Sequence, residues 1–170
     1  MSEEIHKEKL KKLSEEIEML RKHATKQRLA FSSPTTEQLK KKLESTHTPF
    51  IISQSWTDVG SAIGTFLYQL NIYNPDPDSH DNLYAYFFFG PANMVQDVGT
   101  ALHSVDETLY RGFVEFPPVS PDSYTYIIFN YRFPSSTPAG LYIGNSFIFI
   151  REPHDVGIYI DRGCIYVRIT

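Results

Sequence analysis

In the first part of the chain, apolar side chains recur at alternating steps of three and four residues. Five positions make this stripe: Leu10, Leu13, Ile17, Leu20 and Ala24. The residues between them are mostly Lys and Glu, which favour a solvent-exposed helical surface. The spacing predicts an amphipathic helix with a coiled-coil-like seam. Because a lone helix with so narrow an apolar stripe is marginal in water, we expect the seam to pack against a partner.

Two partners for this seam are open. It can meet the same helix of another copy in a short coiled coil, or it can lie on the β-rich remainder of its own chain. The stripe is shorter than the three to four heptads that make a coiled coil a firm prediction, and Gln27 ends it with a polar residue. We take self-association as the leading interpretation, which gives a homo-oligomer, for example a trimer.

A second, shorter helix is predicted over residues 35–45. Its N-cap is one of three residues: Ser33, Thr35 or Thr36. Leu39 and Leu43 are four residues apart and therefore share one helix face. We interpret the basic run Lys40–Lys42 beside them as a solvated surface, with contact to an acidic surface as the alternative.

From residue 50 onward the pattern changes to runs of β-branched and aromatic residues separated by Pro, Gly, Asp, Asn and Ser, which are typical of strands and turns. The predicted strands are 50–56, 64–73, 83–89, 109–116, 124–133, 141–150, 156–160 and 164–170. About eight strands without a long helix between them favour a mainly β fold. We predict an antiparallel, jelly-roll-like β-sandwich that follows the two helices. Residues 91–108 stay open between a loop with a short helix and a weak edge strand.

A hairpin is predicted between the last two strands. The residues Asp161-Arg162-Gly163 separate these strands, and their composition suits a short loop. We expect Gly163 to adopt the left-handed backbone conformation in that loop. The strands 156–160 and 164–170 should then pair with each other.

Two of the predicted strands are apolar on both faces: LYAYFFF at 83–89 and YTYIIFNY at 124–131. A strand in an antiparallel sheet with one solvent-facing surface should instead alternate between apolar and polar residues. Tyrosine on the second face suits an interface, because it joins a large apolar ring to a hydroxyl group. We expect another subunit to cover this second face, with the N-terminal helices or a ligand such as a glycan as alternatives.

Composition divides the chain at about residue 46. Residues 1–45 hold eleven Lys and Arg against eight Glu, a net charge of +3, and no glycine. Residues 46–170 hold the other five basic residues against twelve acidic ones, a net charge of −7, with all nine glycines. We predict a helical oligomerisation segment at 1–45 and a β-sandwich domain at 46–170. The acidic balance of the sandwich argues against nucleic-acid binding.

The most polar stretch between the strands is NPDPDSHDN at 74–82. Its carboxylates, Asp76, Asp78 and Asp81, are hard oxygen ligands of the kind that calcium prefers. The glycine and the terminal glutamate of an EF-hand loop are missing, and Asn, Asp, Pro and Ser are also the residues that turns use. We interpret 74–82 as a loop at one end of the sandwich, with a calcium site as the alternative. No other cofactor is indicated.

The sequence contains no familiar motif for catalysis. It has no G-x-S-x-G elbow, no H-E-x-x-H pair and no glycine-rich phosphate loop. The single cysteine, Cys164, excludes a disulfide within the chain and is expected as a small buried thiol. We therefore expect a protein without enzymatic activity.

Apolar runs in the sequence are too short to cross a bilayer, and the first residues lack the apolar core of a signal peptide. We expect a cytoplasmic protein or part of an assembled particle, without membrane contact. The leading hypothesis is a structural or assembly protein of shell, fibre or adaptor type, whose helices associate copies and whose sandwich presents a surface to other proteins. The alternative is a β-sandwich binding module that engages calcium or a glycan through its loops.

Overall fold

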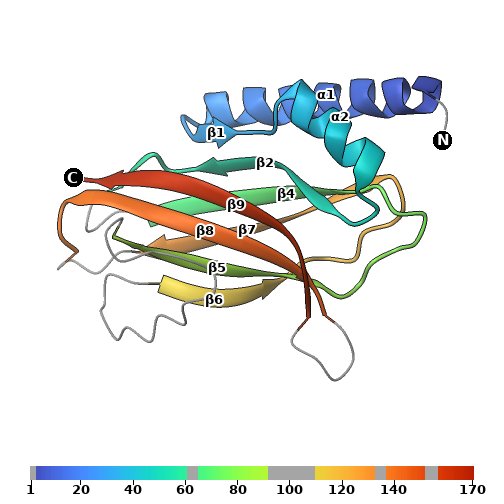
Figure 1. Cartoon of the computed structure of the whole chain (residues 1–170). Coiled ribbons are helices and arrows are strands. Elements are labelled where there is room, and N and C mark those ends of the chain that lie inside the picture. The colour runs from blue at the N-terminus through green and yellow to red at the C-terminus, as the bar shows by residue number, and fades with distance from the viewer. Residues whose placement is uncertain (1–2, 61–64, 92–109, 133–136, 152–156) are drawn as a thin grey trace.

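The computed structural model describes residues 3–60, 65–91, 110–132, 137–151 and 157–170, and it consists of two β-sheets with two helices along one side (Figure 1). The first sheet has four strands in the order β1 (Ala30–Ser32), β2 (Phe50–Trp56), β4 (Thr65–Asn74) and β7 (Ser123–Arg132). The second has five strands in the order β3 (Val59–Gly60), β9 (Ile158–Ile169), β8 (Gly140–Ile150), β5 (Leu83–Pro91) and β6 (Tyr110–Glu115). Neighbouring strands are antiparallel except in the short β3–β9 pair. The predicted mainly β fold with antiparallel strands and two helices is confirmed.

The main hydrophobic core lies between the two sheets. Rings from facing strands meet there: the centroids of Phe66 and Phe89 are 5.2 Å apart, and those of Tyr68 and Phe87 are 5.1 Å apart. All four side chains are almost completely buried. Side chains alternate in direction along β4 and β5, so one face of each strand points into a shared core.

A small polar cluster lies inside this apolar core. The Tyr68 hydroxyl donates to Gln54 Oε1 at 2.7 Å and lies 2.8 Å from the Ser146 hydroxyl. Burial raises the pKa of Tyr68 far above its ordinary value, so the phenol stays protonated. Buried polar groups are costly only when they lack partners, and these three satisfy one another across the two sheets.

Both helices lie over the outer face of the four-stranded sheet (Figure 1). They are α1 (Glu3–Lys26) and α2 (Thr36–Ser45). Thr35 caps α2, because its hydroxyl accepts the Gln38 amide hydrogen at 3.2 Å while the Gln38 side chain accepts the Thr35 amide hydrogen at 2.9 Å. Within the described residues, neither helix combines the length with the apolar character that crossing a membrane requires.

The apolar stripe of α1 is buried within its own chain. Leu13, Ile17 and Ala24 are almost completely buried, and Leu10 and Leu20 are partly buried. All of these residues except Ala24 belong to a second hydrophobic cluster. The other members of this cluster are Phe31, Leu39, Leu43, Phe50, Ile52 and Tyr73. The structure thus places the stripe in an intramolecular interface, in place of the intermolecular association seam that we preferred from the sequence.

The segment that joins the helices also contributes to the sheet. Between α1 and α2 the chain forms β1, whose Ala30 pairs with Trp56 of β2. The guanidinium of Arg21 on α1 lies 4.9 Å from the centroid of the Phe31 ring on β1. The break in composition near residue 46 is therefore not a break in packing.

The hairpin predicted around Asp161-Arg162-Gly163 is wrong. Residues 158–169 form one strand, β9, which pairs with β8. Asp161 pairs with Ile148 and Tyr159 with Phe149, so Ile160 is the extra residue of a β-bulge. A Cβ atom added at Gly163 would lie 2.5 Å from Gln54 Oε1. Glycine is required there for close approach to the buried polar cluster, not for a left-handed turn.

Next to this bulge, Asp161 links three elements. Its Oδ2 atom accepts the amide hydrogen of Ile51 on β2 at 2.8 Å, and its Oδ1 atom lies 3.2 Å from Nζ of Lys42 on α2. The register of β2 shifts directly after Ile51, so the carboxylate satisfies an amide beside an irregular part of the ladder. One side chain of β9 therefore contacts both β2 and the helix layer.

The remaining predicted strands correspond to β2 and to β4 through β8 with small changes at their ends, and the structure adds the short β1 and β3. Residues 74–82 join β4 of one sheet to β5 of the other, as a loop (Figure 1). Of the ambiguous segment 91–108, Pro91 ends β5 and the rest lies outside the described residues.

Candidate functional site

The outer face of the five-stranded sheet carries neighbouring aromatic side chains on three strands. Seven residues make this aromatic face: Tyr84, Tyr86, Phe88, Phe147, Phe149, Tyr159 and Tyr166. The alternate residues of β8 and β9, such as Ile148 and Ile165, point into the core between the sheets. The helices cover the other sheet (Figure 1), so only one of the two outer faces has the helical cover that we considered from the sequence.

The rings of the aromatic face contact one another. Tyr84 and Phe149 are stacked with centroids 5.3 Å apart and an angle of 15° between their planes. The Tyr159 ring approaches the Phe149 ring edge-on, with centroids 5.9 Å apart, and is tilted against the Phe147 ring, with centroids 6.4 Å apart. Because ring faces pack against neighbouring rings, Tyr84, Phe88 and Phe147 are buried, and the exposed part of the face centres on Tyr159 and Tyr166.

A cation is fixed on the same face. The guanidinium of Arg162 lies 5.6 Å from the centroid of the Phe147 ring, and its Nη2 atom donates to Asn145 Oδ1 at 3.1 Å. Arg168 is exposed two positions beyond Tyr166 on the same strand. The carboxylate of Asp161 points away from the aromatic face, toward the Ile51 amide. The two arginines therefore give this part of the face a positive charge.

Part of the aromatic face is open to solvent. Tyr159 and Tyr166 are 50% and 54% exposed, and Leu141 at its margin is about half exposed. Single exposed apolar residues are common on proteins, but neighbouring ones rimmed by charge mark interaction sites. Cys164 is a free, half-buried thiol on this face, opposite Asn145, and not the buried thiol that we expected.

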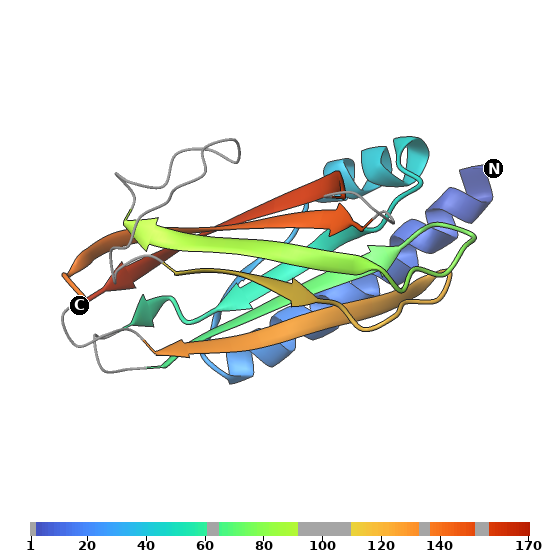
Figure 2. The same ribbon diagram turned by 90° about the horizontal axis from the view of Figure 1, so that it is seen from below.

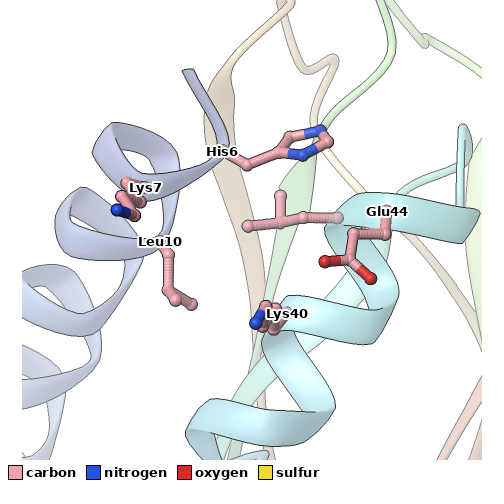
Figure 3. Close-up of a pocket in the computed structure, with 6 residues that line it drawn as sticks. His6, Lys7, Leu10, Lys40 and Glu44 are labelled. Carbon is pink, nitrogen blue, oxygen red and sulfur yellow. The ribbon is translucent and has the colours of Figure 1, made fainter. Parts of the chain in front are cut away.

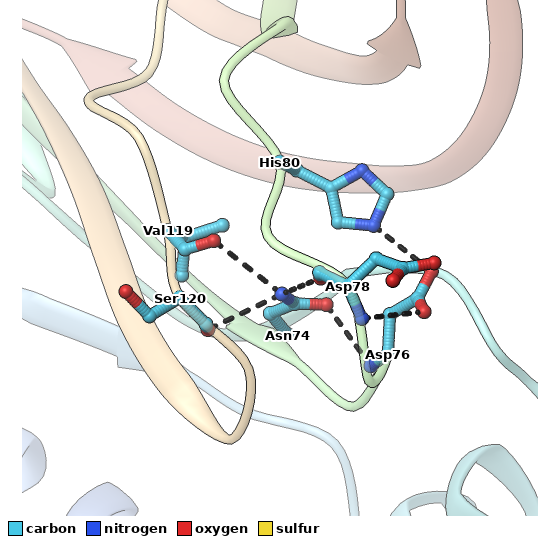
Figure 4. A network of polar contacts seen from close by, with 6 residues as sticks. All are labelled: Asn74, Asp76, Asp78, His80, Val119 and Ser120. Atoms are coloured by element: carbon cyan, nitrogen blue, oxygen red, sulfur yellow. Dashed lines mark hydrogen bonds and ion pairs between the residues drawn. The ribbon is translucent and has the colours of Figure 1, made fainter.

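The polar loop at 74–82 is held by its own hydrogen bonds (Figure 4). Asn74 Nδ2 donates to the carbonyl oxygen of Asp78 at 2.9 Å. Asp76 Oδ1 accepts the Asp78 amide hydrogen at 3.0 Å, and Asp76 Oδ2 lies 3.0 Å from His80 Nε2. The backbone of His80 pairs with that of Val119, in the segment before β7. These Asn and Asp side chains serve local turn geometry.

The calcium alternative receives no support from this geometry. Both Asp76 carboxylate oxygens already have partners, while Asp78 and Asp81 are exposed. In the part of the chain that the structure describes, no three His, Cys, Asp or Glu side chains are grouped so that they could hold a metal ion. Calcium binding at Asp76, Asp78 and Asp81 stays a prediction.

We expect Asp76→Asn to make the stability of the protein less sensitive to acid. Burial acts to raise the pKa of Asp76, but the Asp78 amide and His80 outweigh it and hold this pKa below its ordinary value. Such a carboxyl stabilises the fold above its unfolded-state pKa of about 3.9, and this contribution is lost as the pH falls through the folded-state pKa. Between about pH 5 and about pH 2, the free energy of unfolding in urea should therefore fall less in the variant.

The matched control for this measurement is Asp81→Asn, an exposed carboxyl in the same loop. It should follow the original chain across the same pH range. Equal pH dependence of Asp76→Asn and the original chain would show that the contacts of the Asp76 carboxylate with the Asp78 amide and His80 do not stabilise the folded state.

A cleft of about 350 Å³ opens between α1 and α2 (Figure 3). Its lining residues are His6, Lys7, Leu10, Lys40, Leu43 and Glu44. The two leucines are the more buried part of this lining, and the lysines and the glutamate are exposed. Charges of both signs at an open rim define no particular ligand, so the aromatic face is the stronger candidate site.

Comparisons with known proteins inform the fold. Neither the protein-family models nor the curated protein sequences include a match to this chain. The crystal structure of the C-terminal domain of wzt is similar, with a TM-score of 0.52 and 11% identity over 84% of this chain and 78% of that chain. The CARDB domain of the PF1109 protein from Pyrococcus furiosus, solved in complex with di-metal ions, has a TM-score of 0.44 and 16% identity over 72% of this chain and 86% of that chain. At 11% identity, the likeness to the wzt domain shows the fold alone.

Proposed function

We propose that this chain is a non-enzymatic binding module of adaptor type whose aromatic face recognises a partner protein. The observation that carries the proposal is the placement of the half-exposed Tyr159 and Tyr166 beside Arg162 on a sheet face away from the helices. Tyrosine and arginine are the residue types on which binding energy at protein interfaces most often depends. The contacts of Tyr159 with Phe147 and Phe149, and of Arg162 with Phe147, fix these two side chains before binding, which lowers the entropic cost of association.

A protein partner fits this face better than a glycan does. Small ligands favour concave sites in which a few polar groups converge. Here the rings pack against one another across three strands, and the cleft described above lies between the helices instead. The exposed part of the face combines the rings of Tyr159 and Tyr166 with two arginines, and protein–protein interfaces are enriched in these residue types.

The charges on the aromatic face define the partner further. Arg162 and Arg168 favour a partner surface that combines apolar with acidic side chains. A second copy of the same face would bring these arginines toward their own equivalents, which disfavours self-association through this surface. We therefore expect a different protein as the partner.

Selection of phage-displayed peptides on the purified full chain tests this function. We expect the selected peptides to be rich in acidic and apolar residues. Arg162→Glu combined with Tyr166→Ala should weaken their binding by about tenfold or more, because both residues lie in the contact. The matched control is Met19→Ala, which removes an exposed apolar side chain from α1 and should leave peptide affinity unchanged.

Two results would overturn the proposal. One is a selection without enrichment in acidic residues, and the other is equal peptide affinity for the original chain and the double variant, with both folded by circular dichroism. Selective binding on a glycan array that Tyr166→Ala abolishes would replace the protein partner with a sugar at the same face.

A further inference from the structure

The edges of the two sheets differ in length. Three of the edge strands, β1, β3 and β6, have three, two and six residues, whereas β7 has ten. In the described part of the chain, β7 pairs with β4 alone, and Figure 2 shows it along one long side of the molecule. Short edge strands are one way in which proteins avoid pairing with other chains, and β7 is the strand without that protection.

The sequence of β7 also lacks the residues that usually block an edge. The strand SYTYIIFNYR contains no Pro, Lys or Gly, and its one charged residue, Arg132, is at the end. Its pairing with β4 runs from Ser123 to Arg132 without a register shift, so no bulge turns the edge away. A long, regular strand of β-branched and aromatic residues presents a row of backbone groups that can accept a further strand.

The outer surface of β7 continues the apolar surface beneath the helices. Tyr126 is 53% exposed and Tyr124 and Ile128 are also exposed, while Thr125 and Ile127 between them are buried. The ring of Tyr124 lies 5.4 Å from that of Tyr73, which belongs to the cluster under α1. Burial, with Glu16 of α1 and Asp122 nearby, raises the pKa of Tyr124 to about 12. The apolar row of Tyr124, Tyr126 and Ile128 therefore begins beside the helix layer and runs along the edge strand.

We propose that two copies of this chain pair through β7, antiparallel about a two-fold axis, so that their four-stranded sheets join into one continuous sheet. A strand paired in this way is complementary to itself, because each copy offers the same edge to the other. With the axis at Tyr126, the two Tyr126 rings lie opposite each other and Tyr124 lies opposite the partner subunit's Ile128. Aromatic and β-branched residues in such cross-strand pairs stabilise a sheet.

This pairing assigns self-association to the edge of β7 and not to the α1 stripe, which the fold has already buried. It is also independent of the aromatic face, which belongs to the other sheet. The dimer would leave both aromatic faces open, so a partner protein and a second copy would not compete.

A charge exchange at the proposed axis tests the pairing. By light scattering on a sizing column, the original chain should have the mass of two chains. Tyr126→Lys and Tyr126→Glu should each have the mass of one chain, because two like charges then meet at the axis. An equal mixture of the two variants should regain the mass of two chains, since opposite charges now face each other.

The matched control is Tyr166→Lys, which places the same charge at an equally exposed tyrosine of the other sheet and should keep the mass of two chains. Circular dichroism should show that every variant is folded, because Tyr126 is already half exposed. Ile128→Lys is a second variant, and it should also lower the mass. A single-chain mass for the original protein, an unchanged mass for Tyr126→Lys, or a mixture that stays monomeric would each overturn the proposal.

Discussion

Leu13→Asp is expected to destabilise the fold by roughly 4 kcal/mol or more, because it combines the loss of a buried leucine with the burial of a carboxyl group. Leu13 is 1% exposed and packs among α2 and the four-stranded sheet. Domains of this kind have total stabilities of about 5–15 kcal/mol, so the helix layer should detach or the whole chain unfold. Urea denaturation followed by circular dichroism measures the change.

Met19→Asp is the matched control for this prediction. Met19 is on the same helix but is 63% exposed, so the same charge should change stability by less than about 0.5 kcal/mol. If Leu13→Asp instead kept the original stability and lowered only the mass of an oligomer, the stripe would be an intermolecular seam. The experiment thus separates the two partners that the spacing of the stripe left open.

Gly163→Ala is expected to destabilise the fold by about 1–3 kcal/mol through overpacking. The added Cβ atom would lie 2.5 Å from Gln54 Oε1, and Gln54 is held by its hydrogen bond with Tyr68. The free energy of unfolding should fall accordingly. In a Gln54→Ala background the same change at Gly163 should be less harmful, because the obstructing side chain is gone.

Gly163→Asn distinguishes close approach from a turn. Asparagine tolerates the left-handed conformation better than alanine does, so in a hairpin loop it would be the milder replacement. Beside Gln54 it is the larger side chain and should be the more harmful one. A more stable Asn than Ala variant would therefore return Gly163 to the turn that the sequence predicted.

Most elements of this fold could be predicted because their signals are local. The N-cap at Thr35, the leucines of α2 and the apolar runs of β2, β4, β5, β7 and β8 are all written in short stretches. The order of the strands could not be predicted in this way, since it depends on contacts between residues far apart in the chain. For the same reason the sequence led us to prefer self-association of the α1 stripe, because packing within the chain requires the same spacing.

The candidate site was only partly visible in the sequence. The apolar pattern on both faces of residues 83–89 indicated a second face, which the structure locates on β5. Arg162 was missed because Asp161-Arg162-Gly163 has the composition of a turn. In the structure these three residues belong to one bulged strand, β9, in which Gly163 lies close to Gln54. Neither the bulge nor this close approach leaves a local signal in the sequence.

The link made by Asp161 has a consequence for the timing of folding. The helices are synthesised first, but the carboxylate that contacts Lys42 and Ile51 follows them by 119 and 110 residues. Contacts over such separations form late, since the intervening chain must first be ordered. On the ribosome, α2 would therefore emerge long before Asp161, so its link to β9 would form only when the last strand joins the sheet, whereas the apolar partners of the helices, Phe50, Ile52 and Tyr73, are synthesised soon after them.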